Sequence, residues 1–284
     1  MSEPIRADLS GKTCLVTGAN AGIGKAVARQ LARLGARVVL ACRNAEKGEA
    51  ARREIEGATG NHDLEVMTVD LSSRRSIDPF VESFAKRHPA LHVLVNNAGV
   101  WLEKRQESAD RIEMTWATNV LGYLRLTDRL LPALEAAPAA RVVNVASQLA
   151  GGLDLADVEF KRRTYGGRAA YAQSKQADRM LTWALARRLD GTTVTANALH
   201  PGFVSTELFS KAGGFLAVAA TAYAKLWALK PDQGADTAAW LAASPEVQGR
   251  NGLFWIERQE RRCRFRDPTA EEALWTLCLE MTTA

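Results

Sequence analysis

The sequence predicts an α/β protein built on a doubly wound parallel sheet with helices on both faces. From residue 12 to about residue 199, short apolar segments alternate with longer segments of helical pattern, which is typical of consecutive strand–helix–strand units. The short segments are continuously apolar, as expected of strands that are covered on both faces of a parallel sheet. A glycine-rich turn joins the first apolar segment to the first helical one. There is no internal repeat or linker, so we expect residues 1–284 to form a single domain.

The predicted elements follow one another in chain order. The strands are the short apolar runs Thr13–Thr17, Arg37–Ala41, Leu64–Asp70, Val93–Asn96, Arg141–Ala146 and Thr193–Leu199. The segments between them have helical spacing and cover Ile23–Leu34, Ala45–Gly57, Ser73–His88, Arg111–Ala136 and Ala169–Leu189. After Pro201 the pattern changes, and we expect one or two helices in Ser205–Leu229, a helix at Gln233–Ala243, a strand at Gly252–Ile256 and a last helix at Thr269–Met281.

Composition and charge argue against several classes of function. The net charge is +5, but neither of the densest basic groups, Lys161-Arg162-Arg163 and Arg258 to Arg266, alternates regularly with aromatic residues as in a nucleic-acid groove. The four cysteines form no CxxC pair and no ligand cluster with the four histidines, so we expect no metal site and a reducing, cytoplasmic location. Met1 to Lys12 is polar and no apolar stretch reaches the ~18 residues that span a bilayer, so we expect no signal peptide or integral membrane anchor.

The glycine-rich turn from Thr17 to Gly24 predicts a dinucleotide site. Glycines allow a tight turn and let backbone N–H groups approach a pyrophosphate, which the positive end of the following helix also attracts. The spacing is Gly-x3-Gly-x-Gly instead of the usual Gly-x-Gly-x-x-Gly, so the prediction depends on the position of the turn between strand and helix. The expected cofactor contacts in this turn are Gly18, Asn20, Gly22, Ile23 and Gly24.

The end of the second strand predicts which dinucleotide binds. NAD sites place a carboxylate about 20 residues after the glycine turn to hold a ribose hydroxyl, whereas this strand ends Leu40-Ala41-Cys42-Arg43-Asn44. The guanidinium of Arg43 suits a 2′-phosphate, so we predict NADP(H). The alternative for Arg43 is a solvated side chain at a strand end. Asp70 and Leu71 end the third strand and are placed to meet the adenine, although Asp70 has the alternative role of capping the next helix.

Tyr171 and Lys175 lie four residues apart in a predicted helix and therefore share one of its faces. A free tyrosine titrates near pH ~10, which makes it a poor proton donor or acceptor at neutral pH. A neighbouring ammonium favours the phenolate and lowers the pKa of the phenol. Because Tyr-x-x-x-Lys is also common on amphipathic helices, the pair indicates a catalytic site only together with the motifs around it.

These motifs follow one another in a definite order. They are the glycine-rich turn, Asn96-Asn97-Ala98-Gly99, Asn119, Ser147, Tyr171 with Lys175, and Pro201-Gly202. Over roughly its first 205 residues the chain thereby resembles the short-chain dehydrogenase/reductase superfamily. Leu40-Ala41-Cys42-Arg43, the stretch His92 to Gly99, Ala273-Leu274-Trp275 and the long gap between Ser147 and Tyr171 are similar to its retinol dehydrogenase-like branch. That branch often carries a hydrophobic N-terminal anchor, which we do not expect here because Met1 to Lys12 is polar, and its usual Ser-Ser is Ala146-Ser147 in this sequence.

The resemblance implies a Rossmann-like fold and a role for each motif residue. Ser147 would hold the substrate oxygen, Tyr171 would transfer the proton, and Lys175 would lower the pKa of Tyr171 and bind the nicotinamide ribose. Asn119 would belong to a water relay that leads to bulk solvent, would bridge backbone segments within the domain, or both. The remaining implied cofactor contacts are Asn97, Ala98, Gly99, Pro201, Gly202, Val204 and Thr206.

The segment after Gly202 is rich in apolar and aromatic residues. Ligands of open α/β sheets bind outside the carboxyl ends of the strands, where this segment is expected. We predict a helical lid over an apolar substrate, within a catalytic and lid region of about residues 151–230 that follows a cofactor-binding part of about residues 12–150. The sequence leaves open whether residues 205–229 form this lid, a subunit interface or a membrane-facing surface. Leu153 and Phe160 are further candidates for the mouth of the substrate site.

The sequence thus predicts an NADP(H)-dependent oxidoreductase that interconverts an apolar alcohol with an aldehyde or ketone through a Ser-Tyr-Lys-Asn set. The alternative is a catalytically idle NADP(H)-binding regulatory or scaffold subunit, which the intact Ser147, Tyr171 and Lys175 disfavour. A hydrolase that pairs His200 with Ser147 would need a Gly-x-Ser-x-Gly elbow, which the sequence lacks, so we read His200 as a strand residue. The expected partner is a small apolar alcohol or carbonyl compound. The natural substrate, the stereochemistry, the physiological direction and the formation of a homo-oligomer stay open.

Overall fold

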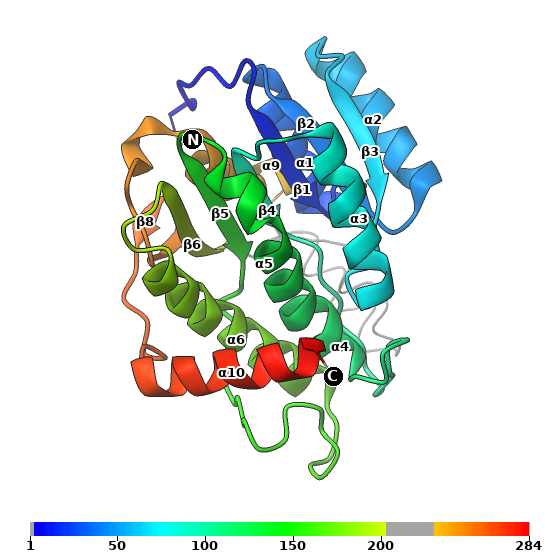
Figure 1. Ribbon diagram of the computed structural model, residues 1–284, viewed down its shortest axis with the longest axis vertical. Coiled ribbons are helices and arrows are strands. Elements are labelled where there is room, and N and C mark those ends of the chain that lie inside the picture. Colours follow the sequence, from blue (N-terminus) through cyan, green and yellow to red (C-terminus); the bar gives the residue numbers. More distant parts are fainter. Residues whose placement is uncertain (1–2, 203–229, 284) are drawn as a thin grey trace.

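The computed structural model of the chain (Figure 1) describes residues 3–202 and 230–283 and confirms the predicted α/β architecture. One eight-stranded sheet has the strand order β3-β2-β1-β4-β5-β6-β7-β8. Its strands are β1 (Thr13–Thr17), β2 (Arg37–Cys42), β3 (Leu64–Thr68), β4 (Val93–Asn96), β5 (Ala140–Val145), β6 (Val194–His200), β7 (Phe254–Ile256) and β8 (Gln259–Glu260). Strands β1 to β7 pair in parallel, and β8 pairs antiparallel with β7. Strand β8 was not predicted, because its two exposed polar residues carry no apolar pattern.

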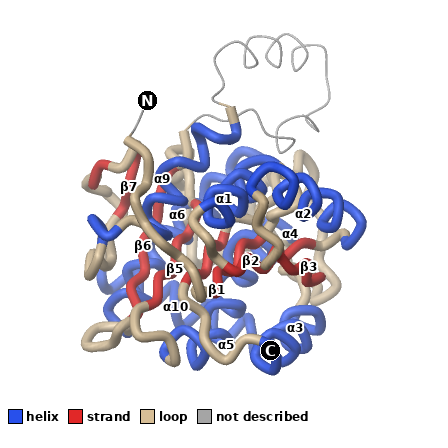
Figure 2. Tube along the Cα trace, turned by 90° about the horizontal axis from the view of Figure 1, so that it is seen from above, coloured by secondary structure: helices blue, strands red, loops and turns tan. Residues whose placement is uncertain are grey.

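Helices cover both faces of this sheet, as predicted. They are α1 (Gly22–Arg33), α2 (Ala45–Thr59), α3 (Arg74–Arg87), α4 (Met114–Trp116), α5 (Gly122–Glu135), α6 (Gly167–Arg188), α9 (Pro231–Ala243) and α10 (Pro268–Thr283), with a short 3-10 helix at Pro245–Val247. Figure 2 shows α1, α2 and α9 on one side of the sheet and α3, α5 and α10 on the other. Helix α10 packs along α6 on the outside of this second layer.

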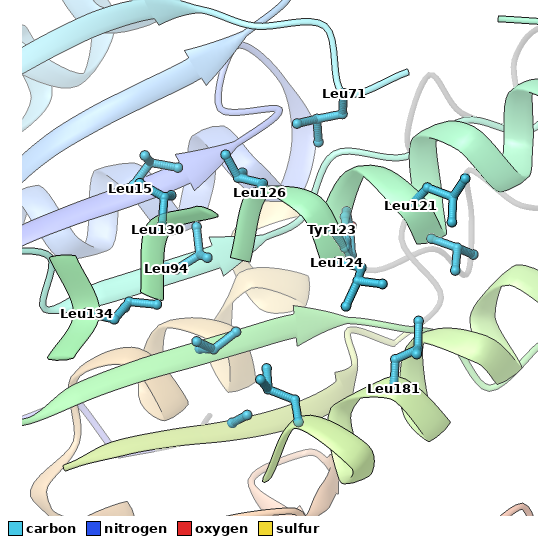
Figure 3. Packing of buried hydrophobic residues seen from close by; sticks show 14 of the residues in the cluster. Leu15, Leu71, Leu94, Leu121, Tyr123, Leu124, Leu126, Leu130, Leu134 and Leu181 are labelled. Carbon is cyan, nitrogen blue, oxygen red and sulfur yellow. The ribbon is translucent and has the colours of Figure 1, made fainter. Parts of the chain in front are cut away.

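The two faces of β1 illustrate why the strands have continuously apolar sequences. Cys14 and Val16 belong to a hydrophobic core that includes residues of α1 and α9, whereas Leu15 belongs to the core on the opposite face. All three side chains are fully buried. Figure 3 shows Leu15 close to Leu126 and Leu130 of α5. Successive side chains of a strand point to opposite faces, so a strand with helices on both sides needs apolar residues at every position.

The predicted helix Arg111–Ala136 is in fact composed of three pieces and begins later. Arg111 has a left-handed backbone with φ of 60°, which interrupts a helix. Glu113 then caps α4 with its fully buried carboxylate, which accepts hydrogen bonds from the N–H groups of Thr115 (2.9 Å) and Trp116 (2.7 Å). A π-helical turn, η1 (Ala117–Leu121), joins α4 to α5. Such turns are frequent at functional sites, and this one carries Asn119.

The strand order reverses between β1 and β4, which places a crevice at the carboxyl ends of these strands. The loops that follow β1, β2, β4, β5 and β6 carry most of the predicted site residues, so the topology brings them to one edge of the sheet. Val204, Thr206 and the predicted helices of Ser205–Leu229 lie outside the described residues. Among the helices that the structure does describe, none combines the length and apolar character needed to cross a bilayer.

Candidate active site

A cavity of about 750 Å³ opens at the carboxyl ends of the strands. Its wall includes the predicted cofactor contacts Gly18, Asn20, Gly22, Ile23, Arg43, Asp70, Leu71, Asn97, Ala98, Gly99, Tyr171, Lys175, Pro201 and Gly202. Ser147 also lines the cavity, whereas Gly24 and Asn119 lie outside its lining. The structure therefore brings segments that are up to 184 residues apart, from Gly18 to Gly202, to one site.

The glycine-rich turn is tied to the loop after β4. The hydroxyl of Thr17 accepts hydrogen bonds from the backbone N–H groups of Asn97 (2.9 Å) and Ala98 (3.0 Å), and the Asn97 amide donates to the Thr17 carbonyl (2.9 Å). A Cβ at Gly24 would lie only 2.4 Å from the Asn97 amide nitrogen and 2.5 Å from the Gly18 carbonyl oxygen. The lack of a side chain at Gly24 thus allows α1 to start close against this loop. This packing explains why a glycine is needed at a position that does not line the cavity.

The start of α1 and the side chain of Arg43 both suit a dinucleotide. Ala21 is the N-cap residue of α1, and within the described residues no side chain caps its first N–H groups, so these groups are available to an anion. Arg43 is exposed and lines the cavity, and it makes no hydrogen bond or ion pair with any residue in the described ranges. Asn44, beside it, caps α2 by accepting a hydrogen bond from Lys47 N–H at 2.8 Å. The donor groups and the cavity volume fit NADP(H).

Asp70 lies beyond the end of β3, which is shorter than predicted and stops at Thr68. One carboxylate oxygen of Asp70 accepts hydrogen bonds from Ser72 N–H (2.9 Å) and from the Ser72 hydroxyl (2.7 Å). The side chain therefore stabilises the turn before α3, whose N-cap residue is Ser73. Asp70 also lines the cavity, so the structural and the cofactor-facing roles are compatible.

Tyr171 and Lys175 share the buried face of α6, with 7% and 3% of their surface exposed. The Lys175 ammonium nitrogen lies 5.8 Å from the centroid of the Tyr171 ring. Burial raises the pKa of Tyr171, while the charge of Lys175 and a hydrogen bond with Ser147 act in the opposite direction. Ser147 follows β5, and its hydroxyl oxygen also accepts a hydrogen bond from Leu149 N–H at 3.1 Å. These three side chains therefore meet at one point of the cavity wall.

Asn119 links the loop after β4 to α6. Its carbonyl oxygen accepts a hydrogen bond from Val100 N–H (2.8 Å), and its amide donates to the Val100 carbonyl (3.1 Å) and to the Ser174 hydroxyl (3.1 Å). The side chain is fully buried in the π-helical turn. The geometry gives Asn119 the backbone-bridging role, and its part in a water relay stays a prediction.

Two side chains near Tyr171 and Lys175 were not predicted from the sequence. The indole of Trp101, in the loop after β4, lies against the Tyr171 ring. The carboxylate of Asp178 accepts a hydrogen bond from Lys175 Nζ at 2.8 Å. The spacing of three residues between Lys175 and Asp178 was a usable signal, because such residues share a helix face. Nothing in the sequence around Trp101 indicates its contact.

Further lining residues were not predicted to belong to the site. They are Thr17, Ala21, Lys25, Ala41, Cys42, Val69, Val100, Thr118, Val145, Ala146, Gln148, Leu149, His200 and Pro231. Most are small or apolar and flank predicted residues, so only the assembled cavity identifies them.

Phe160 and Leu153 were candidates for the mouth of the substrate site, but neither side chain lines the cavity. Phe160 is 5% exposed and packs edge-on against Tyr165 with 5.4 Å between ring centroids, and Leu153 packs against the hydrophobic core.

His200 ends β6, and its Nδ1 accepts a hydrogen bond from Gln148 N–H at 3.1 Å. Burial lowers the pKa of His200 to about 4. Because Nδ1 accepts this bond, the proton of the neutral imidazole lies on Nε2, so neither ring nitrogen is free to act as a base toward Ser147.

The four cysteines are free thiols, three of them buried. Within residues 3–202 and 230–283, no three His, Cys, Asp or Glu side chains gather in a way that could hold a metal ion. Hydroxyl, phenol and ammonium groups of Ser147, Tyr171 and Lys175 line the cavity.

Comparison with known proteins gives consistent results. Residues 12–214 match the family model described as short chain dehydrogenase. Retinol dehydrogenase 13 of Homo sapiens is 39% identical over 258 residues, which cover 89% of this chain and 78% of that protein. Polyprenol dehydrogenase of Mus musculus is 39% identical over 291 residues, which cover 99% of this chain and 87% of that protein.

Solved structures agree with these sequence matches. An uncharacterized protein from Mycobacterium paratuberculosis superimposes with a TM-score of 0.80 at 31% identity, covering 98% of this chain and 96% of that one. A short chain dehydrogenase from Burkholderia cenocepacia, solved in complex with NADP, superimposes with a TM-score of 0.68 at 29% identity. That match covers 87% of this chain and 96% of the other.

Proposed function

The chain belongs to the short-chain dehydrogenase family, and on this premise we propose that it interconverts an apolar alcohol and the corresponding aldehyde or ketone with NADP(H). The family uses NAD(P)(H) and acts on CH–OH groups. The observation that carries the proposal is that Ser147, Tyr171 and Lys175 line the same cavity as the glycine-rich turn. A proton donor therefore lies beside a dinucleotide-sized site.

We assign the cofactor to residues at two strand ends, those of β1 and β2. The N–H groups at the start of α1 would hold the pyrophosphate, and Gly18 would allow its close approach, since its φ of 66° suits a glycine. Arg43 would hold the 2′-phosphate of NADP(H), because its guanidinium is exposed, lines the cavity and forms no ion pair within the described residues. The absence of a carboxylate at the end of β2 further supports NADP(H) over NAD(H).

In the direction of reduction, the Tyr171 hydroxyl donates its proton to the carbonyl oxygen of the substrate, and the Ser147 hydroxyl donates a hydrogen bond to the same oxygen. Lys175 stabilises the phenolate that Tyr171 then carries, because an ammonium near a phenol favours the anion. In the direction of oxidation, the Tyr171 phenolate accepts the alcohol proton. When bound, NADP(H) supplies or accepts the hydride.

We propose a lipid- or isoprenoid-like substrate. The support is the similarity to proteins named retinol dehydrogenase 13 and polyprenol dehydrogenase. The cavity wall includes the apolar side chains of Val100, Ala146 and Leu149. We also propose that the chain is a single domain that acts in the cytoplasm, and its four free cysteine thiols are compatible with a reducing compartment.

The test is a turnover assay of the purified protein with NADPH or NADH and a panel of apolar aldehydes and ketones that includes retinal and a polyprenal. We expect a preference for NADPH and a loss of about 100-fold or more in kcat for Tyr171→Phe, since general acid catalysis contributes about that much. Tyr165→Phe is the matched control, because the Tyr165 hydroxyl donates to the Leu102 carbonyl and does not line the cavity. NADPH binding without turnover of any compound, or full activity of Tyr171→Phe, would contradict the proposal.

A further inference from the structure

Asp178 lies three residues after Lys175 on the buried face of α6, and the two side chains form an ion pair. Their contact measures 2.8 Å, and the side chains of Lys175 and Asp178 are only 4% and 1% exposed. The Lys175 ammonium also donates to the Val145 carbonyl at 3.0 Å. A buried pair is screened little by water or salt, so both charges act strongly on neighbouring groups.

Among the described residues, few other charged or titratable groups face this pair. On α6 itself they are Tyr171 and Arg179; α5 contributes Tyr123 and α10 contributes Cys278. The Lys175 ammonium lies 5.2 Å from the centroid of the Tyr123 ring and 5.8 Å from that of Tyr171. The ammonium is thus in contact with one carboxylate and close to two phenol rings.

This arrangement changes what Lys175 does to Tyr171. A lone ammonium would attract the developing phenolate with the field of a full charge. An ammonium that contacts a carboxylate acts on a third group as a dipole, because the anion repels the phenolate that the cation attracts. Both partners lie within one helical turn of each other, so the geometry is set by the helix backbone.

The inference rests on the proposed function of Tyr171 and Lys175. We infer that Asp178 is a positioning residue: its carboxylate holds the Lys175 ammonium in place and cancels part of the positive charge that Tyr171 experiences. The causes that act on Tyr171 agree with this, since burial raises its pKa, Lys175 lowers it and Asp178 raises it again. Asp178 therefore favours the neutral phenol, which is the form that donates a proton during carbonyl reduction.

The decisive experiment measures the ionisation of Tyr171 directly and needs no turnover. The chain has four tyrosines, so ¹³Cζ-labelled tyrosine gives few NMR signals, and Tyr171→Phe identifies the one of interest. In Asp178→Asn, which keeps a hydrogen-bond acceptor for Lys175 but removes the charge, we expect the titration midpoint of Tyr171 to fall by about one pH unit. In the same variant, the pH at which alcohol oxidation reaches half its maximal rate should fall by the same amount.

Asp128→Asn is the matched control, because it removes one negative charge from an exposed position of α5; its Tyr171 midpoint should equal that of the unchanged protein. An unchanged or higher titration midpoint of Tyr171 in Asp178→Asn would overturn the inference. The inference would also be overturned if Tyr171 does not titrate below the pH of unfolding in either the unchanged protein or Asp178→Asn. If Asp178→Asn does not fold, Asp178→Ser tests the same expectation. A protein without turnover whose Tyr171 midpoint still falls in Asp178→Asn would refute the proposed function alone.

Discussion

The indole ring of Trp101 lies against the phenol ring of Tyr171, with 4.9 Å between the ring centroids and 35° between the ring planes. Trp101 comes from the loop after β4, and Tyr171 comes from α6, 70 residues further along the chain. The indole N–H donates to the Glu103 carboxylate at 2.8 Å, which fixes the direction of the ring. Trp101 therefore covers one side of the proposed proton donor and helps to hold it in position.

Replacing this indole should reduce catalysis without abolishing it. An aromatic pair of this kind contributes about 0.5–1.5 kcal/mol, so we expect Trp101→Ala to lower kcat/KM for a carbonyl substrate by about 2- to 12-fold. Trp101→Phe keeps an aromatic ring and should retain most of the activity. Steady-state kinetics on both variants provides the measurement. Equal activity of Trp101→Ala and the unchanged protein would show that the ring contact plays no part in positioning Tyr171.

Arg43 should determine the choice of cofactor. Hydrogen bonds to charged groups contribute about 1.5–3 kcal/mol, so Arg43→Ala should weaken NADPH binding by about 10- to 150-fold. Binding of NADH, which lacks the 2′-phosphate, should change little. Titration of both dinucleotides by fluorescence or calorimetry measures the two dissociation constants.

Arg53→Ala is the control for Arg43→Ala, since Arg53 is an exposed residue of α2 and its loss changes the net charge equally. Its NADPH affinity should be within about twofold of the unchanged protein, because exposed charges are well screened. Should both variants lose affinity alike, the effect of Arg43 would be one of net charge and our assignment of the 2′-phosphate would be wrong.

Gly24 and Gly57 give a paired test of the glycine-rich turn. A Cβ at Gly24 would meet the Asn97 amide and the Gly18 carbonyl, so Gly24→Ala should lower the free energy of unfolding by about 1–3 kcal/mol and weaken NADPH binding. Gly57 lies in α2 with no neighbour within 4 Å of an added Cβ. Gly57→Ala should therefore raise stability by up to ~1 kcal/mol, through helix propensity alone. Urea unfolding measures both values, and a tolerated Gly24→Ala would disprove the close packing of α1 on the loop.

Glu272 should contribute pH-dependent stability. Hydrogen bonds from Arg188 and Arg187 lower its pKa from 4.5 to about 2. A lowered acid pKa means that the unfolded state binds more protons, so the contribution is present above pH 4.5 and is lost as the pH falls towards 2. Because the Glu272 side chain is 46% exposed, Glu272→Gln should cost no more than ~1 kcal/mol at pH 7. Unfolding at pH 7 and pH 2.5 should show a clearly larger cost at the higher pH, and an equal cost at both would exclude the linkage.

Much of the fold could be predicted from local patterns. The positions of β1 and β4 agree with the predicted strands residue for residue, because helices cover both faces of the sheet and leave a continuous apolar signal. The glycine-rich turn was identifiable because only glycine meets the steric demand at Gly24. The start of α4 was predicted wrongly, since the left-handed Arg111 and the cap from Glu113 depend on a fold that no local spacing reveals.

The sequence by itself determined the order of the elements, the glycine turn and the presence of Ser147, Tyr171 and Lys175, because each depends on residues that are near one another in the chain. Only the tertiary structure decided which side chains surround them. The contact of Trp101 with Tyr171 joins a loop to a helix, and the burial of the Lys175–Asp178 pair depends on α5 and α10 closing over α6. Helical spacing places two charges on one face, but the field they exert depends on whether water reaches them, and that is a property of the packed molecule.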